Sequence, residues 1–140
     1  MIDTAPGAFS PEARAFLSAT RFAVVATVGA DGTPHQAVTW YTLDGDVLVL
    51  NSAEGRRWPT DLIRDRRVAV MVEDGYRYVA LAGSVEIDRD QERAQADIAA
   101  MARRYHADDP AHAEELIADT FRRQRRISFR LRPSAVGQDL

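Results

Sequence analysis

The segment 51–59, NSAEGRRWP, holds the residues of this chain that are best suited to bind an anion. Gly55 permits a backbone conformation that other residues avoid, and Pro59 stands where a first helical turn would begin. Arg56 and Arg57 carry guanidinium groups, which donate charge-assisted hydrogen bonds to phosphate or carboxylate. Backbone N–H groups at the start of a helix would add to such a site. One interpretation is therefore a phosphate site, and the other is a surface turn whose two arginines are simply solvated.

Elsewhere the side chains indicate no catalytic or metal site. The chain has no cysteine, which excludes disulfides, thiolate metal ligands and a cysteine nucleophile. His35, His106 and His112 include no pair at metal-ligand spacing on one predicted helix face. Ser18 has no base placed by the sequence to activate it as a nucleophile. The arginine pair 125–126 could reach a ligand, but a solvated surface is the favoured interpretation. We therefore predict no catalytic residue and no metal ligand.

Length and charge restrict the class of protein. The chain has 140 residues, enough for one domain with a substantial core, so we expect a single domain over residues 1–140. Its formal net charge of −3 and its pI near 5.6 do not favour nucleic acid as a partner. No run approaches the ~18 apolar residues of a membrane helix, and the first residues lack the features of a secretion signal. We therefore expect a cytoplasmic protein with no membrane partner.

Two periodicities alternate along the chain. Capped amphipathic patterns predict helices from Ser10, over 89–106 and from Pro110 onward. Strands are predicted at 22–28, 35–43, 46–50, 67–73, 76–87 and 125–131. Gly83 lies inside the fifth of these strands, where a bulge or a close backbone approach would bend it. Antiparallel strands in meander order bury one face best by curling closed, so we expect a mainly β fold, a small six-stranded barrel with flanking helices. Only the first eight residues and the last four are expected to be disordered.

The order of these features resembles a known family. The first predicted strand is followed by DGTP (31–34), the second contains the aromatic pair WY (40–41), and the crossing reads GRRWPTDLIRDRRVAV (55–70). Together they are similar to the split-barrel family of pyridoxamine-phosphate-oxidase-like proteins. The similarity is greatest to its actinobacterial branch of oxidoreductases, which depend on the deazaflavin coenzyme F420. The likeness extends from the opening helix to ISFRLRPSAV (127–136), which is nearly the whole chain.

The resemblance implies a homodimer of six-stranded split barrels, with a flavin or deazaflavin in a groove at the subunit interface. The cofactor would be F420, with FMN as the alternative, and a small molecule would be the substrate. The residues implied to contact the cofactor are Pro34, His35, Gln36, Ala37, Asn51, Ser52, Gly55, Arg56, Arg57, Trp58, Tyr76, Tyr78 and Val79. Among them, Ser52, Gly55 and the two arginines would hold the phosphate, and the strand that begins at Pro34 would line the ring.

The implied activity is the reduction of an activated or conjugated double bond by hydride transfer from the reduced deazaflavin. The ring carries out this chemistry, so the protein needs only to hold ring and substrate and to exclude water. An FMN-dependent oxidoreductase is the alternative enzyme, and a carrier or sensor that binds flavin or heme without turnover is the alternative from another class.

Two positions depart from the family pattern. Trp58 stands where a lysine is common, and Asp61 stands where an asparagine is common. We expect Trp58 to lie beside the cofactor groove, because a buried indole needs apolar cover and a partner for its N–H group. An acid near a phosphate would repel it unless the acid is paired with an arginine.

Overall fold

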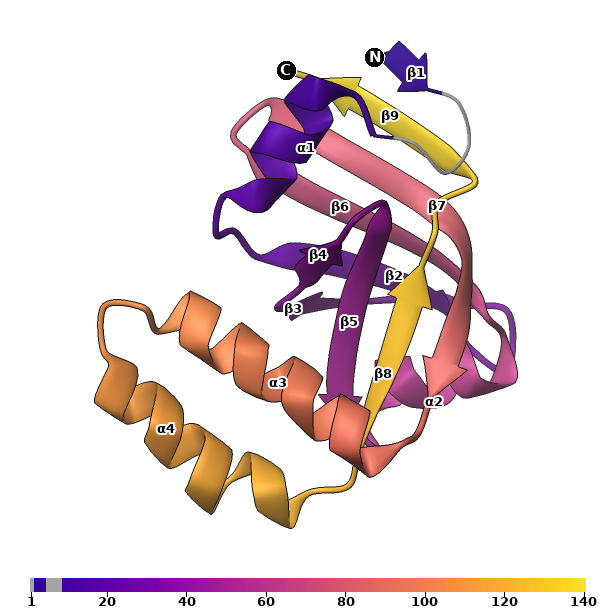
Figure 1. The fold of residues 1–140 in the computed structure, drawn as a ribbon. Helices are drawn as coiled ribbons and strands as arrows, with labels where there is room; N and C mark the ends of the chain where they lie inside the picture. Colours follow the sequence, from indigo (N-terminus) through magenta and orange to yellow (C-terminus); the bar gives the residue numbers. More distant parts are fainter. Residues whose placement is uncertain (1, 5–8) are drawn as a thin grey trace.

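The computed structural model describes residues 2–4 and 9–140 (Figure 1). The strands are β1 (Ile2–Thr4), β2 (Ala23–Val28), β3 (Pro34–Thr39), β4 (Thr42–Asp44), β5 (Val47–Ala53), β6 (Arg67–Asp74), β7 (Arg77–Asp88), β8 (Arg126–Leu131) and β9 (Ala135–Asp139). The helices are α1 (Pro11–Ser18), α2 (Arg57–Arg64), α3 (Gln91–Tyr105), α4 (Pro110–Asp119) and the short 3-10 helix η1 (Phe121–Arg123). The prediction of a mainly β fold with flanking helices is confirmed for the described residues.

The strands form one antiparallel half-barrel. Their order is β3-β2-β6-β7-β8-β5-β4, and β9 pairs with β7 and β1. The long strand β7 changes partner along its length, because residues 77–84 pair with β6 and residues 85–88 pair with β8. Gly83 sits at this change, where an added Cβ would lie 3.0 Å from Leu131 Cδ1 and 3.2 Å from the Ser134 amide nitrogen. The close backbone approach predicted at Gly83 is confirmed.

The segment 35–43 is not one strand, as the sequence suggests, but two. It breaks at Trp40 and Tyr41 into β3 and β4. The Tyr41 side chain is fully buried, and its hydroxyl donates to the Leu17 carbonyl oxygen at 2.7 Å. This long-range contact turns the chain at a point where local alternation predicts a continuous strand.

Both ends of the chain are more ordered than predicted. The last four residues were expected to be disordered, yet β9 reaches Asp139 and pairs with residues 78–82 of β7. The segment Ile2–Thr4 pairs with β9 as β1, so the expected disorder is wrong there too. Residue 1 and residues 5–8 lie outside the described residues. With β1, β9 and the division of segment 35–43 into two, the described chain has nine strands, whereas the sequence predicts six.

One face of the half-barrel carries the main core. In β2 and β6 every second side chain is buried, which is the pattern of a sheet with one covered face. The helices α1 and α2 lie toward opposite ends of this core (Figure 1). α1 contributes Phe16 and Leu17, and its N-cap Ser10 accepts a hydrogen bond from the Ala13 amide at 3.0 Å. These contacts hold the ends of the strands from which the site is built.

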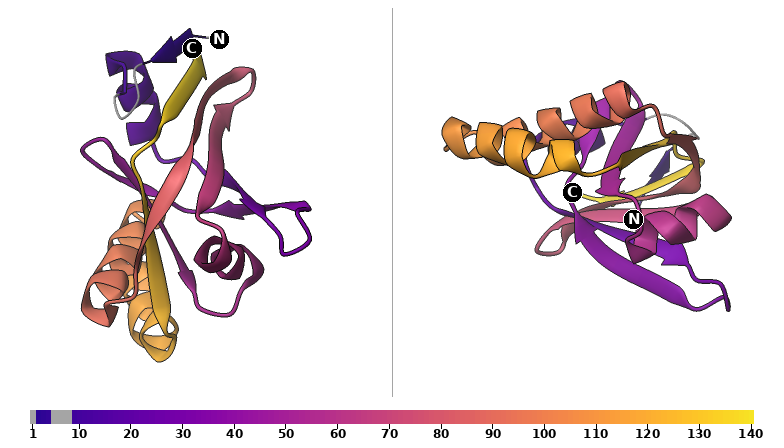
Figure 2. Two further views of the ribbon diagram at one scale, coloured as in Figure 1. Left: turned by 90° about the vertical axis from the view of Figure 1, so that its right-hand side faces the viewer. Right: turned by 90° about the horizontal axis from the view of Figure 1, so that it is seen from below.

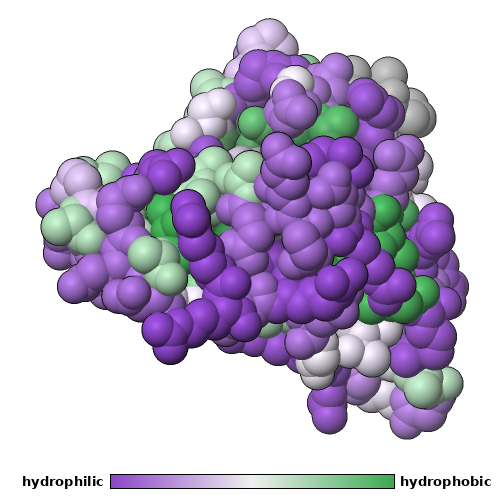
Figure 3. Space-filling model, turned by 60° about the horizontal axis from the view of Figure 1, so that its bottom comes forward, coloured by the Kyte–Doolittle hydropathy of each residue, from purple (hydrophilic) through white to green (hydrophobic). Residues whose placement is uncertain are grey.

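The helices α3 and α4 form a hairpin along the outside of β5 and β8 (Figure 2). Small side chains, among them Ala102 of α3 and Ala113 of α4, let the two helices pack closely. Because α3 covers the second face of β8, this strand is buried on both faces. The surface around the helices is mainly hydrophilic (Figure 3). None of the helices in the described part of the chain is long and apolar enough to cross a membrane.

The strands β3, β2 and β6 keep their second face open. Val24 is the cross-strand partner of both Val38 and Met71, so the three side chains form a row across the strands. Val38 and Met71 remain 69% and 42% exposed, and Phe22, directly before β2, is 61% exposed. The half-barrel therefore presents an apolar sheet face that the described chain does not cover.

Candidate anion-binding site

The crossing from β5 to α2 leaves the first turn of the helix without a cap. Gly55 adopts a φ of +98°, which glycine tolerates best, and the helix then begins at Arg57. Arg56 occupies the N-cap position but makes no side-chain cap hydrogen bond. The first N–H groups of α2 therefore lack the acceptor oxygen that serine, asparagine or aspartate would supply. Both arginines are exposed, and the adjacent Glu54 pairs with other arginines.

A cavity of about 280 Å³ opens beside this helix start, between the half-barrel and α3. Its lining residues are Phe22, Val38, Thr39, Trp40, Asn51, Arg56, Ile98, Phe121 and Arg126. Apolar side chains form most of the wall, and three of them are aromatic. The polar contribution comes mainly from one amide and two guanidinium groups. This combination suits an anion that also carries an apolar group.

Arg126, the first residue of β8, is a buried cation in the cavity wall, with only 4% of its surface exposed. Its Nε donates to Asn51 Oδ1 at 3.0 Å, and its Nη1 donates to Gln124 Oε1 at 2.6 Å. Its guanidinium carbon lies 5.0 Å from the centroid of the Phe121 ring. Burial, and secondarily the neighbouring Arg56, lowers the pKa of Arg126 from 12.5 to about 10. The guanidinium is thus still cationic at neutral pH, and no described carboxylate pairs with it.

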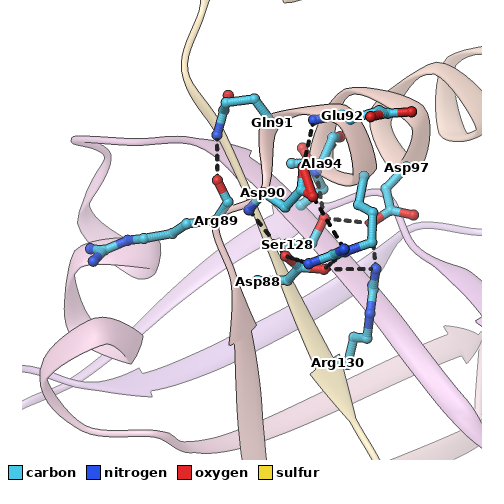
Figure 4. A network of polar contacts seen from close by, with 11 residues as sticks. Asp88, Arg89, Asp90, Gln91, Glu92, Ala94, Asp97, Ser128 and Arg130 are labelled. Carbon is cyan, nitrogen blue, oxygen red and sulfur yellow. Dashed lines mark hydrogen bonds and ion pairs between the residues drawn. The ribbon is translucent and has the colours of Figure 1, made fainter.

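A chain of hydrogen bonds fixes the amide of Asn51, which in turn orients Arg126. Asn51 Nδ2 donates to the Ala94 carbonyl oxygen of α3 at 2.9 Å and to Ser128 Oγ at 2.9 Å. Because a carbonyl only accepts, this nitrogen must face α3, and the amide oxygen must face the Arg126 donor. The Ser128 hydroxyl in turn donates a hydrogen bond to Asp97 Oδ2 at 2.6 Å (Figure 4). The buried cation is therefore held by a network that is anchored on α3.

Asp61 ties the body of α2 to β2 and β3. Its carboxylate is buried, and Oδ2 accepts a hydrogen bond from Thr27 Oγ1 at 2.8 Å and lies 2.8 Å from His35 Nδ1. Oδ1 accepts from Arg64 Nη2 at 3.2 Å, so the acid has an arginine partner. Burial raises the pKa of Asp61, but the hydrogen bonds from His35, Thr27 and Arg64 outweigh burial and lower it overall.

Trp58 fills the core instead of the cavity wall. Its indole is 7% exposed, and its ring centroid lies 5.6 Å from that of Phe129. The cavity lining does not include it. Trp58 therefore lies on the side of α2 that faces the core, and its contact with a cofactor stays a prediction.

The residues predicted to contact a cofactor fall into several surroundings. Asn51 and Arg56 line the cavity together. Gly55 and Arg57 flank Arg56 in the chain, and Ser52 is buried in β5. On β3, His35 is bonded to Asp61 and Ala37 is half-buried. Pro34 and Gln36 of the same strand are exposed. Tyr76 is 97% exposed in the turn between β6 and β7, Tyr78 is half-buried, and Val79 is fully buried in the core. None of the three residues from the β7 region lines the cavity.

Sequence reasoning missed Arg126 and the aromatic wall. The pair Arg125 and Arg126 was predicted to be solvated, which is correct for the largely exposed Arg125 and wrong for Arg126. The reason is the start of α3, where the Gln91 side chain bonds both the amide and the carbonyl of Arg126 and covers the strand. The aromatic rings come from three separate segments, so no local pattern could have grouped them.

Solved structures share the fold over nearly the whole chain. A protein solved as an F420 reductase is 26% identical, with a TM-score of 0.70, and the match covers 89% of this chain and 94% of that one. A conserved hypothetical protein from Mycobacterium tuberculosis is 23% identical, with a TM-score of 0.76 and coverage of 99% and 89%. A heme storage protein from Vibrio cholerae is 19% identical, with a TM-score of 0.68 and coverage of 92% and 93%. No curated protein matches the chain.

The match to a protein family is equally broad. The family profile described as pyridoxamine 5'-phosphate oxidase matches residues 9–138. This range contains the strands β2–β8, the helical hairpin and the cavity, so the likeness covers fold and site together. This chain therefore belongs to the pyridoxamine 5'-phosphate oxidase family.

Proposed function

We propose that this protein is an oxidoreductase that uses coenzyme F420 to reduce a conjugated double bond in a small molecule. The observation that carries the proposal is the uncapped start of α2, flanked by Arg56 and Arg57 and adjoining an aromatic cavity. The 26% identity to the protein solved as an F420 reductase supports the choice of cofactor.

The residues present fit a cofactor that has a phosphate and a flat ring. The free N–H groups of α2 and the guanidinium groups of Arg56 and Arg57 offer donors to a phosphate. Asp61 does not oppose a phosphate, because its carboxylate is already paired with Arg64 and bonded to His35. The exposed face of β3 gives a flat ring an apolar surface next to the cavity, at Val38.

The bound deazaflavin would supply the hydride. The work of the chain is then to hold the phosphate, to keep the ring against β3 and to exclude water from the reacting atoms. Asn51 and Arg126 contribute by keeping a fixed arrangement of donors in the cavity before any ligand arrives. FMN carries the same phosphate on a related ring, so an FMN-dependent oxidoreductase is the second candidate.

The proposal includes a homodimer. The row of Val38, Val24 and Met71 forms an apolar sheet face that the described chain leaves open. Phe22 and Val38 belong both to this open face and to the cavity lining, so a second copy placed there would complete the groove. Obligate interfaces of this kind bury more than about 2,000 Å².

The test is a titration of purified, cofactor-free protein with oxidised F420 and, separately, with FMN, followed by the fluorescence of each cofactor. We expect saturable binding of both, with the tighter binding to F420. The same titration is applied to the variants Arg56→Ala and Arg57→Ala. Their matched control is Arg67→Ala, which removes an exposed arginine that pairs with Asp65 outside the site. Tighter binding of FMN would replace the proposal by the second candidate. Absence of saturable binding of either cofactor at micromolar protein would overturn the proposal.

A further inference from the structure

The cavity contains a charge that nothing in the described chain balances. Arg126 is cationic at neutral pH and 4% exposed, and its Nη2 has no hydrogen-bond partner among the described residues. A second cation, Arg56, lines the same cavity. Two like charges in a partly desolvated space repel each other, so the arrangement is unfavourable until an anion enters. Asp88 of β7 and Asp97 of α3 both lie against β8, but each of them pairs with Arg130.

The donors of Arg126 are also held in position. The guanidinium is fixed by Asn51 on one side and by Gln124 on the other. Asn51 cannot rotate its amide without losing both the Ala94 carbonyl and the Ser128 hydroxyl. The free Nη2 edge is therefore presented to the cavity with little freedom to turn elsewhere. An unbonded donor on a fixed side chain that is itself largely buried is what a preorganised anion site requires.

The rest of the cavity suits a flat apolar body. Trp40 stacks on Tyr105 with ring centroids 5.0 Å apart and an angle of 11°, which makes it a rigid wall. Phe121 meets Trp40 edge to face at 6.3 Å, and it lies beneath the Arg126 guanidinium. The volume of about 280 Å³ lies at the lower end of the range for small-molecule sites. It therefore suits one or two rings and not a whole flavin cofactor with its side chain.

We propose that this cavity is the substrate site and that it takes a planar, conjugated carboxylic acid, with the carboxylate on Arg126 and Arg56 and the conjugated plane against Trp40 and Phe121. The role of the acid as a substrate rests on the proposed function, but its binding does not. The two sites are adjacent because Arg56 belongs to both the start of α2 and the cavity. A substrate anchored there would place its double bond toward the open face of β3, next to the ring.

The experiment measures ligand binding by calorimetry on the cofactor-free full chain. The ligands are trans-cinnamate, its neutral counterpart cinnamamide, and inorganic phosphate. We expect cinnamate to bind at least tenfold more tightly than cinnamamide, because only the acid meets the two cations. We also expect it to bind more tightly than phosphate, which cannot use the aromatic wall. Equal binding of cinnamate and cinnamamide, or tighter binding of inorganic phosphate, would overturn the proposal.

Variants locate the site. Arg126→Met should weaken cinnamate binding by roughly ten- to a hundredfold. The neighbouring Arg125→Met, on an exposed side chain outside the cavity, should leave the affinity unchanged. Arg126→Gln keeps a donor for Asn51 and gives the same affinity test if the methionine variant does not fold.

The binding test is independent of the cofactor titration. Cinnamate binding that depends on Arg126, in a protein that binds neither F420 nor FMN, would leave this site standing and remove the proposed function. Cofactor binding without Arg126-dependent binding of cinnamate would leave the proposed function standing and remove this site. Retention of full cinnamate affinity by both Arg126 variants would overturn the site itself.

Discussion

Replacement of Asp61 by alanine tests whether this buried acid anchors α2. Asp61 joins the helix to β2 through Thr27 and to β3 through His35, and both contacts are 2.8 Å long. The start of α2 carries the proposed phosphate site, so a loosened helix would affect both stability and cofactor binding. The variant removes the acceptor without adding bulk, which makes its effect easy to interpret.

The size of the effect follows from what the variant leaves unpaired. The Thr27 side chain is 2% exposed and cannot reach water, and an unsatisfied buried donor costs about 1 to 3 kcal/mol. The side chains of His35 and Arg64 are 25% and 41% exposed, so they recover part of their loss from solvent. We therefore expect a total destabilisation of about 2 to 4 kcal/mol at pH 7. With a dependence of about 2 kcal/mol per molar urea, the middle of the usual range, the unfolding midpoint should fall by about 1 to 2 M.

The assay is urea unfolding of the parent and of Asp61→Ala between pH 3 and 7, with Asp65→Ala as the control on a half-buried acid of the same segment that pairs with Arg67. The folded-state pKa of Asp61 is lowered, so its stabilising effect is fully present above the ordinary value of 3.8. This effect is lost as the pH falls below that value through the lowered pKa, so the two chains should converge in acid. A midpoint for Asp61→Ala within experimental error of the Asp65→Ala midpoint at pH 7 would refute the anchoring role.

Three further predictions address the site and the assembly. Arg56→Ala and Arg57→Ala should each weaken F420 or FMN binding by roughly ten- to a hundredfold. The melting temperature should change little, because both side chains are exposed. A titration that gives parental affinity for both variants would show that the turn is only solvated. Val38→Glu should convert a dimer into a monomer in sedimentation velocity, because it charges the open apolar face; a parent that is already a stable monomer at micromolar concentration contradicts the assembly. The chain has two tryptophans, so Trp40→Phe and Trp58→Phe each leave one fluorescent tryptophan. Saturation with cinnamate should change the emission of Trp40 far more than that of Trp58, because only Trp40 lines the cavity. The reverse result would place the ligand outside the cavity.

Local patterns predicted those parts of the fold that depend on local physics. The cap at Ser10 and the alternating burial of β2 and β6 follow from hydrogen bonding and side-chain direction over a few residues. The break at Tyr41 could not be predicted, because the acceptor of its hydroxyl is the Leu17 carbonyl, 24 residues away. The strand β9 was missed because its sequence, AVGQD, has weak strand propensity and gains its conformation by pairing with β7.

The candidate site likewise has a part that local sequence indicates and a part that it does not. Gly55 and the two arginines that follow it are adjacent in sequence, so these residues alone indicate an anion site as one interpretation, beside a solvated turn. Arg126 alternates with Ile127 and Phe129, so the sequence predicts an exposed arginine on a strand with one covered face. Its burial depends on α3, which crosses the second face of β8, and no window around Arg126 contains that information.

The most direct test of the proposed function is a crystal structure of the protein grown in the presence of F420. We predict a dimer in which the phosphate of F420 accepts hydrogen bonds from the backbone N–H groups of Arg57 and Trp58 and from the Arg56 side chain, with the deazaflavin ring lying along β3. We also predict that Arg126 faces the space left beside the ring. A phosphate bound away from the start of α2, or a ring held entirely by one copy of the chain, would contradict the account.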